Sequence, residues 1–428
     1  MIKASAIFLI VIAVTWFTLS PLALDGWTQN AVSEPISRTY YYFDYACVTY
    51  SENSSNGYFD APVNYSDTEV NQTVHVLYVG GAAQFSGNST NPYQMRMGNG
   101  TCGYIVLKIN LTYRNITGIL YNISANPYIF KGEYPEIPAA VLEKYVKKPA
   151  KAVNTTVRHA FEKWLIHLGY VPSQVSKAFI ALSAAQFIYG QHFIKYSASA
   201  LPRSLDDVVG NKTGDCDDMS RILLNLLWGY GIPAKMEYAY VYLPYNDTFN
   251  VEGSYITFVN AGPHAYVLTY LPRVGWVSLD FLAGALIYNP SLITGESLQA
   301  NITRSEVVET VKELKQYRYA EVIMAYSASS LPAELRTLLN NEAALRNYLH
   351  SLITPYLEKI KANLSLRNNT VTQPESNVTA AQGKHSTAGN LPPNPSPFTP
   401  KAMLIASSLA LLATTATLLI SARKGVGQ

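Results

Sequence analysis

Residues 212–233 read KTGDCDDMSRILLNLLWGYGIP and have the pattern of an amphipathic helix that begins at a cysteine. Asp215 is a favourable N-cap residue, and Asp218, three positions later, supplies the acid of a capping box. Apolar residues then recur at helical spacing, namely Met219, Ile222, Leu223, Leu226 and Leu227. Glycines at 229 and 231, followed by a proline, end the pattern. The stretch predicts a helix with one buried face.

Cys216 lies in the first turn of this predicted helix. Backbone N–H groups without intrahelical partners carry partial positive charge there, which favours a thiolate. Asp217 and Asp218 oppose this effect if their carboxylates point toward the sulfur. An activated thiol at this position therefore requires a histidine.

His264 lies in the stretch GPHAYVLTYLPRVGWVSLDFLAG, residues 262–284. Two strand-like runs, 264–271 and 275–282, flank a short turn. If Leu271 pairs with Gly275, position 266 lies opposite position 280, so that His264 and Asp280 share one face as diagonal neighbours. A slip of one residue in this register places them on opposite faces.

The other two cysteines, Cys47 and Cys102, are expected to pair in an oxidising compartment. Closing a loop of about 55 residues stabilises the fold by roughly 4 kcal/mol in the chain-entropy model. Cys216 is then left unpaired. We expect no metal site, because the histidines lack zinc-ligand spacing, and no cofactor, because the sequence has no calcium loop, P-loop or dinucleotide fingerprint.

Both ends of the chain are apolar. Residues 1–24, with an uncharged run behind Lys3, are typical of a signal peptide or signal anchor. Residues 401–422 are long enough to form a transmembrane helix, and the basic pair in 423–428 favours a cytoplasmic tail. The sequence thus predicts a single-pass protein of the cell membrane, with an extracellular body and a short cytoplasmic C-terminus.

Between these ends the periodicity changes several times. Residues 25–135 predict a β-rich domain, residues 136–300 a mixed domain, and residues 301–365 a helical extension. Residues 366–400 are rich in Asn, Thr, Ser, Pro and Gly and predict a flexible stalk. The formal net charge of +3 and the absence of a basic stripe argue against nucleic acid as a partner.

Residues 105–123 alternate apolar and polar side chains and predict a β-hairpin with residues 114–118 as its turn. Asn110, Asn115 and Asn122 stand in N-x-[ST] triplets within it. Asn110 and Asn122 are expected to face solvent, and Asn115 to lie in the turn. All three are therefore candidate glycosylation sites of an extracellular domain.

The blocks GDCDDMSRILLNLLWGYGIPAK, HAYVLTYLPRVGW and GWVSLDF, in this order, resemble the transglutaminase-like superfamily. The resemblance covers residues 200–285 and implies that residues 136–300 form a transglutaminase-like domain. Such a domain has an α+β, papain-like core with a helix-borne cysteine and an antiparallel sheet. It also implies that Cys216 is the nucleophile, His264 the general base and acid, and Asp280 the residue that orients the imidazole. Two positions depart from the family pattern: Tyr266 replaces a tryptophan, and Phe281 a proline.

The chemistry implied by the resemblance is acyl transfer through a thioester. The Cys216 backbone N–H is one candidate oxyanion donor, and Gln186, Gln191 and Tyr196 are further candidates. Water as the acceptor makes the protein a peptidase or amidase acting on a protein or peptide at the cell surface. An amine as the acceptor makes it a protein crosslinker. If the core is catalytically silent, the protein is instead a surface glycoprotein module for binding or envelope assembly. Its oligomeric state is not specified by the sequence.

Overall fold

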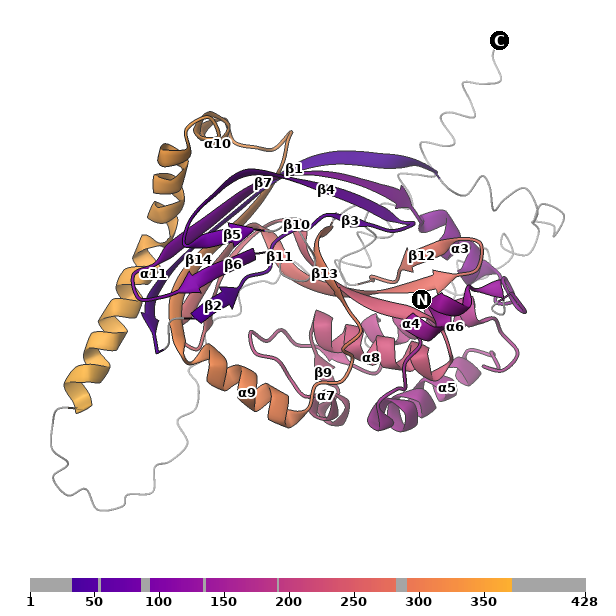
Figure 1. Cartoon of the computed structure of the whole chain (residues 1–428). Coiled ribbons are helices and arrows are strands. Elements are labelled where there is room, and N and C mark those ends of the chain that lie inside the picture. Colours follow the sequence, from indigo (N-terminus) through magenta and orange to yellow (C-terminus); the bar gives the residue numbers. More distant parts are fainter. Residues whose placement is uncertain are drawn as a thin grey trace, which may run out of the picture. The chain divides into compact units, whose positions relative to one another are not determined.

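The computed structural model describes residues 33–371, except 53–54, 86–92, 134–135, 191 and 282–290. In this described part, nine strands form one large sheet in the order β13-β10-β11-β14-β1-β7-β4-β3, with β12 beside β11 (Figure 1). Its strands are β1 (Ser33–Ser51), β3 (Tyr65–Ser66), β4 (Val70–Gly81), β7 (Cys102–Asn115), β10 (Ala234–Val251), β11 (Ser254–Leu271), β12 (Gly275–Ser278), β13 (Ser291–Ser297) and β14 (Tyr317–Ser327). A smaller sheet contains β2 (Ser55–Tyr58), β6 (Tyr93–Met97) and β5 (Ala83–Phe85), and β8 (Lys195–Tyr196) pairs with β9 (Thr213–Gly214).

Two groups of helices pack against the large sheet. The first lies beside β10, β11 and β12 and shares one apolar core with them (Figure 1). It comprises α3 (Thr117–Ala125), α4 (Ala139–Tyr145), the π-helical turn η3 (Val153–Val157), α5 (Arg158–His167), α6 (Lys177–Tyr189), α7 (Leu205–Asn211) and α8 (Cys216–Gly229). The second core lies between β1, β7, β14 and the helices α10 (Ala333–Leu338) and α11 (Glu342–Val371). Helix α9 (Arg304–Leu314) precedes β14.

Strand pairing crosses the domain boundaries that the sequence suggests. β1 and β7, from the segment expected to be a separate β-rich domain, pair antiparallel, and β1 also pairs with β14. β14 in turn runs parallel to β11 of the core. The segment expected to be a helical extension therefore contributes a strand to the middle of the sheet. This strand was missed because residues 320–325 are buried on both faces of the sheet, so their sequence lacks the alternation that identifies a half-buried strand.

The predicted hairpin over residues 105–123 is wrong in its second half, because residues 117–125 form helix α3. Ile119 and Ile123, four residues apart, both point into the helical core, which a spacing of four permits in a helix as well as in a strand. Asn110 is exposed on β7, whereas Asn115 and Asn122 are half-buried. Their glycosylation stays a prediction.

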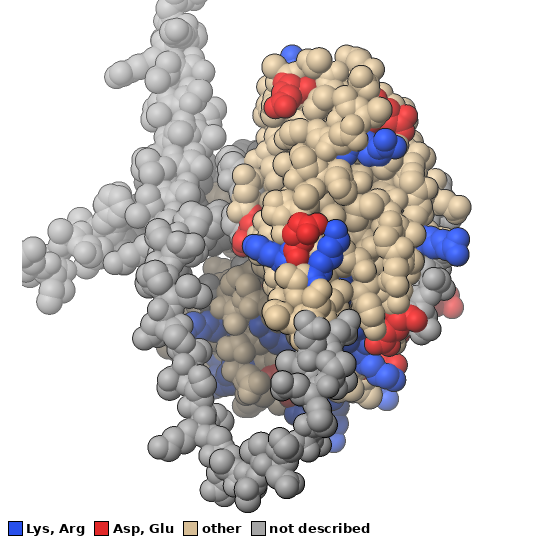
Figure 2. Space-filling model, turned by 90° about the vertical axis from the view of Figure 1, so that its left-hand side faces the viewer, with Lys and Arg blue, Asp and Glu red and all other residues tan. Residues whose placement is uncertain are grey.

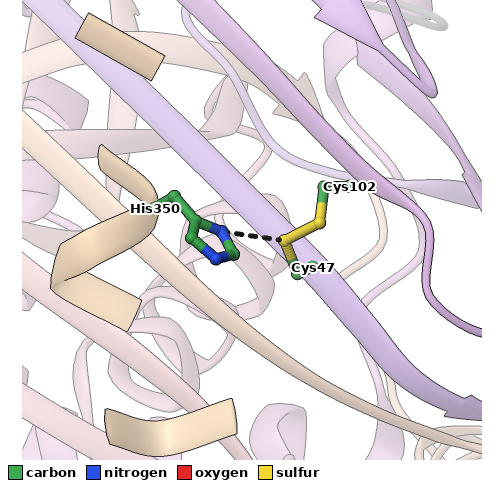
Figure 3. Close-up of side chains that lie close together, drawn as sticks. All are labelled: Cys47, Cys102 and His350. Carbon is green, nitrogen blue, oxygen red and sulfur yellow. Dashed lines mark hydrogen bonds between the residues drawn. A yellow bond between two sulfur atoms is a disulfide. The ribbon is translucent and has the colours of Figure 1, made fainter. Parts of the chain in front are cut away.

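Cys47 and Cys102 stand opposite each other on β1 and β7 and are joined by a disulfide. His350 of α11 lies over this bridge, with Nδ1 3.8 Å from the Cys47 sulfur and 3.1 Å from the Tyr45 hydroxyl (Figure 3). The ligand atoms of the two cysteines and His350 lie within 4.8 Å of one another, but the disulfide occupies both sulfurs. We therefore assign the cluster to the packing of α11 on the sheet.

Three of the predicted segments concern the membrane. Among the described residues, we find no helix with the length and hydropathy that a membrane span requires. The predicted signal peptide or signal anchor at 1–24, the predicted transmembrane helix at 401–422 and the predicted tail at 423–428 lie outside the described residues. The predicted stalk begins too early, because α11 continues to Val371.

Charged side chains are interspersed on the face shown in Figure 2, where acidic and basic groups alternate across a mostly uncharged surface. This distribution agrees with the small net charge of the chain. That face does not present the continuous basic field that nucleic acid binding requires.

We expect the buried acid Asp44 to make stability pH-dependent. Asp44 of β1 and Glu321 of β14 are 0% and 4% exposed. Burial raises the pKa of Asp44 to about 8, although a hydrogen bond with Glu321 lowers it in part. A raised carboxyl pKa stabilises the fold below the ordinary value of 3.8, and this stabilisation is lost as the pH rises through about 8. Asp44→Asn stays neutral, so its free energy of unfolding relative to wild type should be more favourable at pH 8 than at pH 5 by roughly 3 to 4 kcal/mol.

Urea denaturation of wild type and Asp44→Asn at both pH values measures this difference. Glu309→Gln, on the exposed surface of α9, is the control and should show no pH-dependent difference. If Asp44→Asn differed from wild type by the same free energy at pH 5 and pH 8, the assignment of a buried neutral acid would be wrong.

Candidate active site

Cys216 is the first residue of α8, as the sequence predicts. Asp215 is the N-cap and forms a capping box with Asp218, whose Oδ2 accepts a hydrogen bond from the Asp215 backbone N–H at 3.3 Å. The apolar face of α8 is buried in the helical core. Cys216 itself is half-buried and has a free thiol. The helix thus holds the sulfur at its positive end, at the boundary between core and solvent.

The strands β11 and β12 place His264 beside Asp280. Their register pairs Leu271 with Gly275, as predicted, and a backbone hydrogen bond of 2.8 Å from Leu279 to Val267 extends the pairing beyond β12. The His264 Nε2 then lies 2.8 Å from the Asp280 Oδ2. The side chains of both residues are buried, with 7% and 6% of their surface exposed.

The charge of His264 is set by opposing effects. Burial alone lowers its pKa, but the Asp280 carboxylate and hydrogen bonds to Asp280 and Cys216 raise it, to about 10. The imidazole is therefore protonated at neutral pH. Because Nε2 faces Asp280, Nδ1 is the ring nitrogen left for the Cys216 sulfur. The arrangement places the His264 imidazolium beside both the Asp280 carboxylate and Cys216, which suits nucleophilic catalysis.

Tyr266 supports the histidine from one side. Its ring stacks on the His264 ring with centroids 5.7 Å apart, and its hydroxyl donates a 2.7 Å hydrogen bond to Glu237. Burial raises the pKa of Glu237 to about 7, and the positive charge of Lys235 counteracts this in part. Tyr266 thus presents a flat aromatic face to His264 at the position where the family pattern has a tryptophan.

The candidate oxyanion donors lie in different places. Gln186 is exposed on α6, and Gln191 lies outside the described residues. Tyr196 of β8 pairs with Gly214 of β9, two residues before Cys216. Of the side chains proposed from sequence, Tyr196 is therefore the one that strand pairing brings next to the cysteine-bearing segment.

Two contacts behind the cysteine are not predicted from the sequence. Ser220 of α8 and Tyr189 of α6 are buried, and their hydroxyl oxygens are 2.8 Å apart. The Ser220 hydroxyl also contacts the Cys216 carbonyl oxygen. A serine four residues after the cysteine was the available signal, but only the fold shows which tyrosine meets it.

Three aspartates around Cys216 also form a cluster with metal-ligand spacing. The carboxylate oxygens of Asp215, Asp217 and Asp218 lie within 4.8 Å of one another. Arg203 lies 2.7 Å from Asp218 and 3.6 Å from Asp215, and Arg221 pairs with Asp217 and Asp218. Two guanidinium groups already supply the positive charge that a cation would bring. We therefore assign this cluster to an ion-pair network around the start of α8.

Residues 171–281, which include Cys216, His264 and Asp280, match the model of the transglutaminase-like superfamily. The uncharacterized protein YebA of Bacillus subtilis (strain 168) is 24% identical over 243 residues, which are 54% of this chain and 30% of YebA. The match thus spans less than a third of that relative's length.

Solved structures resemble the chain more distantly. A candidate cysteine protease from Cytophaga hutchinsonii is 10% identical, with a TM-score of 0.41 over 71% of this chain and 94% of that one. The periplasmic domain of TgpA from Pseudomonas aeruginosa is 12% identical, with a TM-score of 0.29 over 58% of this chain and 92% of that one.

Proposed function

Because residues 171–281 match the model of the transglutaminase-like superfamily, we propose that this chain is a cysteine hydrolase that cleaves amide or peptide bonds through a thioester. The observation that carries the proposal is the position of His264, whose Nε2 lies 2.8 Å from the Asp280 Oδ2 and whose imidazole interacts with Cys216 at the start of α8. In this proposal Cys216 is the nucleophile, His264 the general base and acid, and Asp280 the residue that orients the imidazole.

The reaction begins with the thiolate of Cys216 and the imidazolium of His264. The sulfur attacks the carbonyl carbon, and the electron pair of the C=O bond moves to oxygen. The Cys216 backbone N–H, at the start of α8, is placed to stabilise this oxyanion, with Tyr196 as a second candidate donor. The C–N bond then breaks, His264 gives its proton to the leaving amine, and a thioester remains.

Hydrolysis of the thioester completes the cycle. The now neutral His264 takes a proton from water, and the oxygen attacks the thioester carbon. The C–S bond breaks and releases a carboxylic acid, which restores the thiolate and the imidazolium. An amine acceptor in place of water gives a new amide instead and makes the same site a crosslinker.

The proposed setting is the outer surface of the cell membrane, with a protein or peptide as the substrate. The disulfide between Cys47 and Cys102 supports an oxidising compartment. The apolar residues 401–422 followed by a basic pair support a C-terminal membrane anchor. N-x-[ST] triplets across the body agree with exposure to the outside.

A trapping experiment tests the proposal. The protein is incubated with a casein digest, quenched in acid and examined by intact mass spectrometry, with and without a labelled primary amine. We expect an acyl adduct on Cys216 and new carboxyl termini in the digest. Label in the products assigns the site to amine transfer. The absence of adduct, cleavage and label would overturn the enzyme assignment and favour a binding module.

A further inference from the structure

The Ser220 hydroxyl joins three elements directly behind the candidate active site. Its oxygen lies 2.7 Å from the Cys216 carbonyl oxygen on α8 and 2.9 Å from the Ala265 carbonyl oxygen on β11. It also lies 2.8 Å from the Tyr189 hydroxyl oxygen on α6. Ser220 is 0% and Tyr189 is 4% exposed, so these contacts are shielded from water.

The Ala265 carbonyl lies where a strand ladder ends. The Val267 carbonyl accepts a hydrogen bond from the Leu279 backbone N–H. Carbonyls two residues apart point to the same side of a strand, so the Ala265 carbonyl points to that side as well. The pairing between β11 and β12 reaches back only to Leu268. A buried carbonyl without a donor is costly, and Ser220 supplies a donor at this point.

The number of hydroxyl protons determines which group donates in each hydrogen bond around Ser220. A serine hydroxyl has one proton, which it directs toward the two carbonyl oxygens, and its own oxygen is then free to accept. Tyr189 therefore donates to Ser220. Burial, together with the nearby Asp280 and Cys216, raises the pKa of Tyr189 well above its ordinary value, so the phenol keeps its proton.

We infer that Ser220 and Tyr189 are positioning residues that fix the distance between Cys216 and His264. They tie the first turn of α8, which carries the cysteine, to the residue that follows the histidine on β11. The apolar side chains that α8 and β11 share in the helical core restrict sliding less than hydrogen bonds do, so the Ser220 contacts set the spacing of these two elements. The inference rests on the proposed function, because it concerns the same cysteine–histidine pair.

The test measures iodoacetamide labelling of Cys216, the one cysteine outside the disulfide. Rates at pH 6 and pH 9.5 are compared for wild type, Ser220→Ala, Tyr189→Phe and His264→Ala. Ser183→Ala, which removes another buried hydroxyl of α6, is the matched control. Thermal unfolding of each variant reports on folding separately.

We expect Ser220→Ala to lower the rate at pH 6 about tenfold, equivalent to 1.4 kcal/mol, while the rate at pH 9.5 stays close to wild type. Tyr189→Phe should lower the rate at pH 6 by a smaller factor, and Ser183→Ala should leave it unchanged. A merely structural role would change the melting temperature without this pH-selective loss.

Two outcomes would overturn the inference. If wild type labels faster at pH 6 than His264→Ala does, and Ser220→Ala and Tyr189→Phe label as fast as wild type, the positioning role alone fails. If wild type shows no dependence on His264, the proposed function fails and the inference with it. Should Ser220→Ala not fold, Tyr189→Phe, which loses a single oxygen, decides the question.

Discussion

Replacing Cys216 with alanine should lower the turnover of any amide substrate at least about 10⁴-fold, because no other group can form the thioester. Cys216 stands at the first turn of α8, where it interacts with the charged imidazole of His264. Binding and oxyanion stabilisation survive the substitution, so we expect a small residual rate. The substrate KM should change little, since the sulfur contributes to the transition state more than to binding.

The measurement is kcat and KM on the best substrate from the trapping experiment. Lys212→Ala, an exposed change four residues before the cysteine, is the control and should retain the wild-type kcat. Turnover by Cys216→Ala within tenfold of wild type would show that the hydrolysis, if any, occurs elsewhere.

Replacing Asp280 with asparagine should lower kcat by about 10³- to 10⁴-fold and lower the pKa of His264. The Asp280 carboxylate is the main favourable influence on the charged imidazole, and its loss leaves burial as the dominant effect. In wild type, the pKa of His264 is raised from 6.5 to about 10, so it stabilises the fold fully below pH 6.5. This stabilisation is lost as the pH rises through about 10.

Asp280→Asn should therefore destabilise the protein at pH 6 and do so progressively less as the pH approaches 10. The ring proton signals of His264, followed by NMR from pH 5 to 10, report its pKa directly, and urea denaturation reports stability. Asp206→Asn, an exposed acid of α7, serves as the control and should change neither. An unchanged His264 pKa in Asp280→Asn would contradict the assigned ion pair.

The features that local sequence predicts are those whose partners are close along the chain. The capping box of Asp215 and Asp218 spans three residues, and the pairing of Leu271 with Gly275 is set by a short turn. This short-range register was enough to place His264 beside Asp280. The Cys47–Cys102 pair followed from the expected oxidising compartment and from the position of both cysteines in the segment 25–135, which left Cys216 unpaired.

Other features depend on contacts between distant segments. Residues 119 and 123 lie on one face both in a helix and in a strand, so their spacing does not distinguish the two. Packing into the apolar core that the helices share with β10 and β11 favours helix α3. The place of β14 between β1 and β11 joins segments more than 200 residues apart, which no local pattern records. The same limit hid the contact between Tyr189 and Ser220.

The central claim is that His264 activates Cys216, and its most direct test is the rate of Cys216 alkylation by iodoacetamide from pH 5 to 9. Wild type is compared with His264→Ala, and unfolding curves confirm that both are folded. We predict rapid labelling of wild type already at pH 5 to 6 and a fall of at least about tenfold at these pH values in His264→Ala. Labelling that rises only near pH 8.5, as for an ordinary thiol, and that is equal in both proteins would contradict the account.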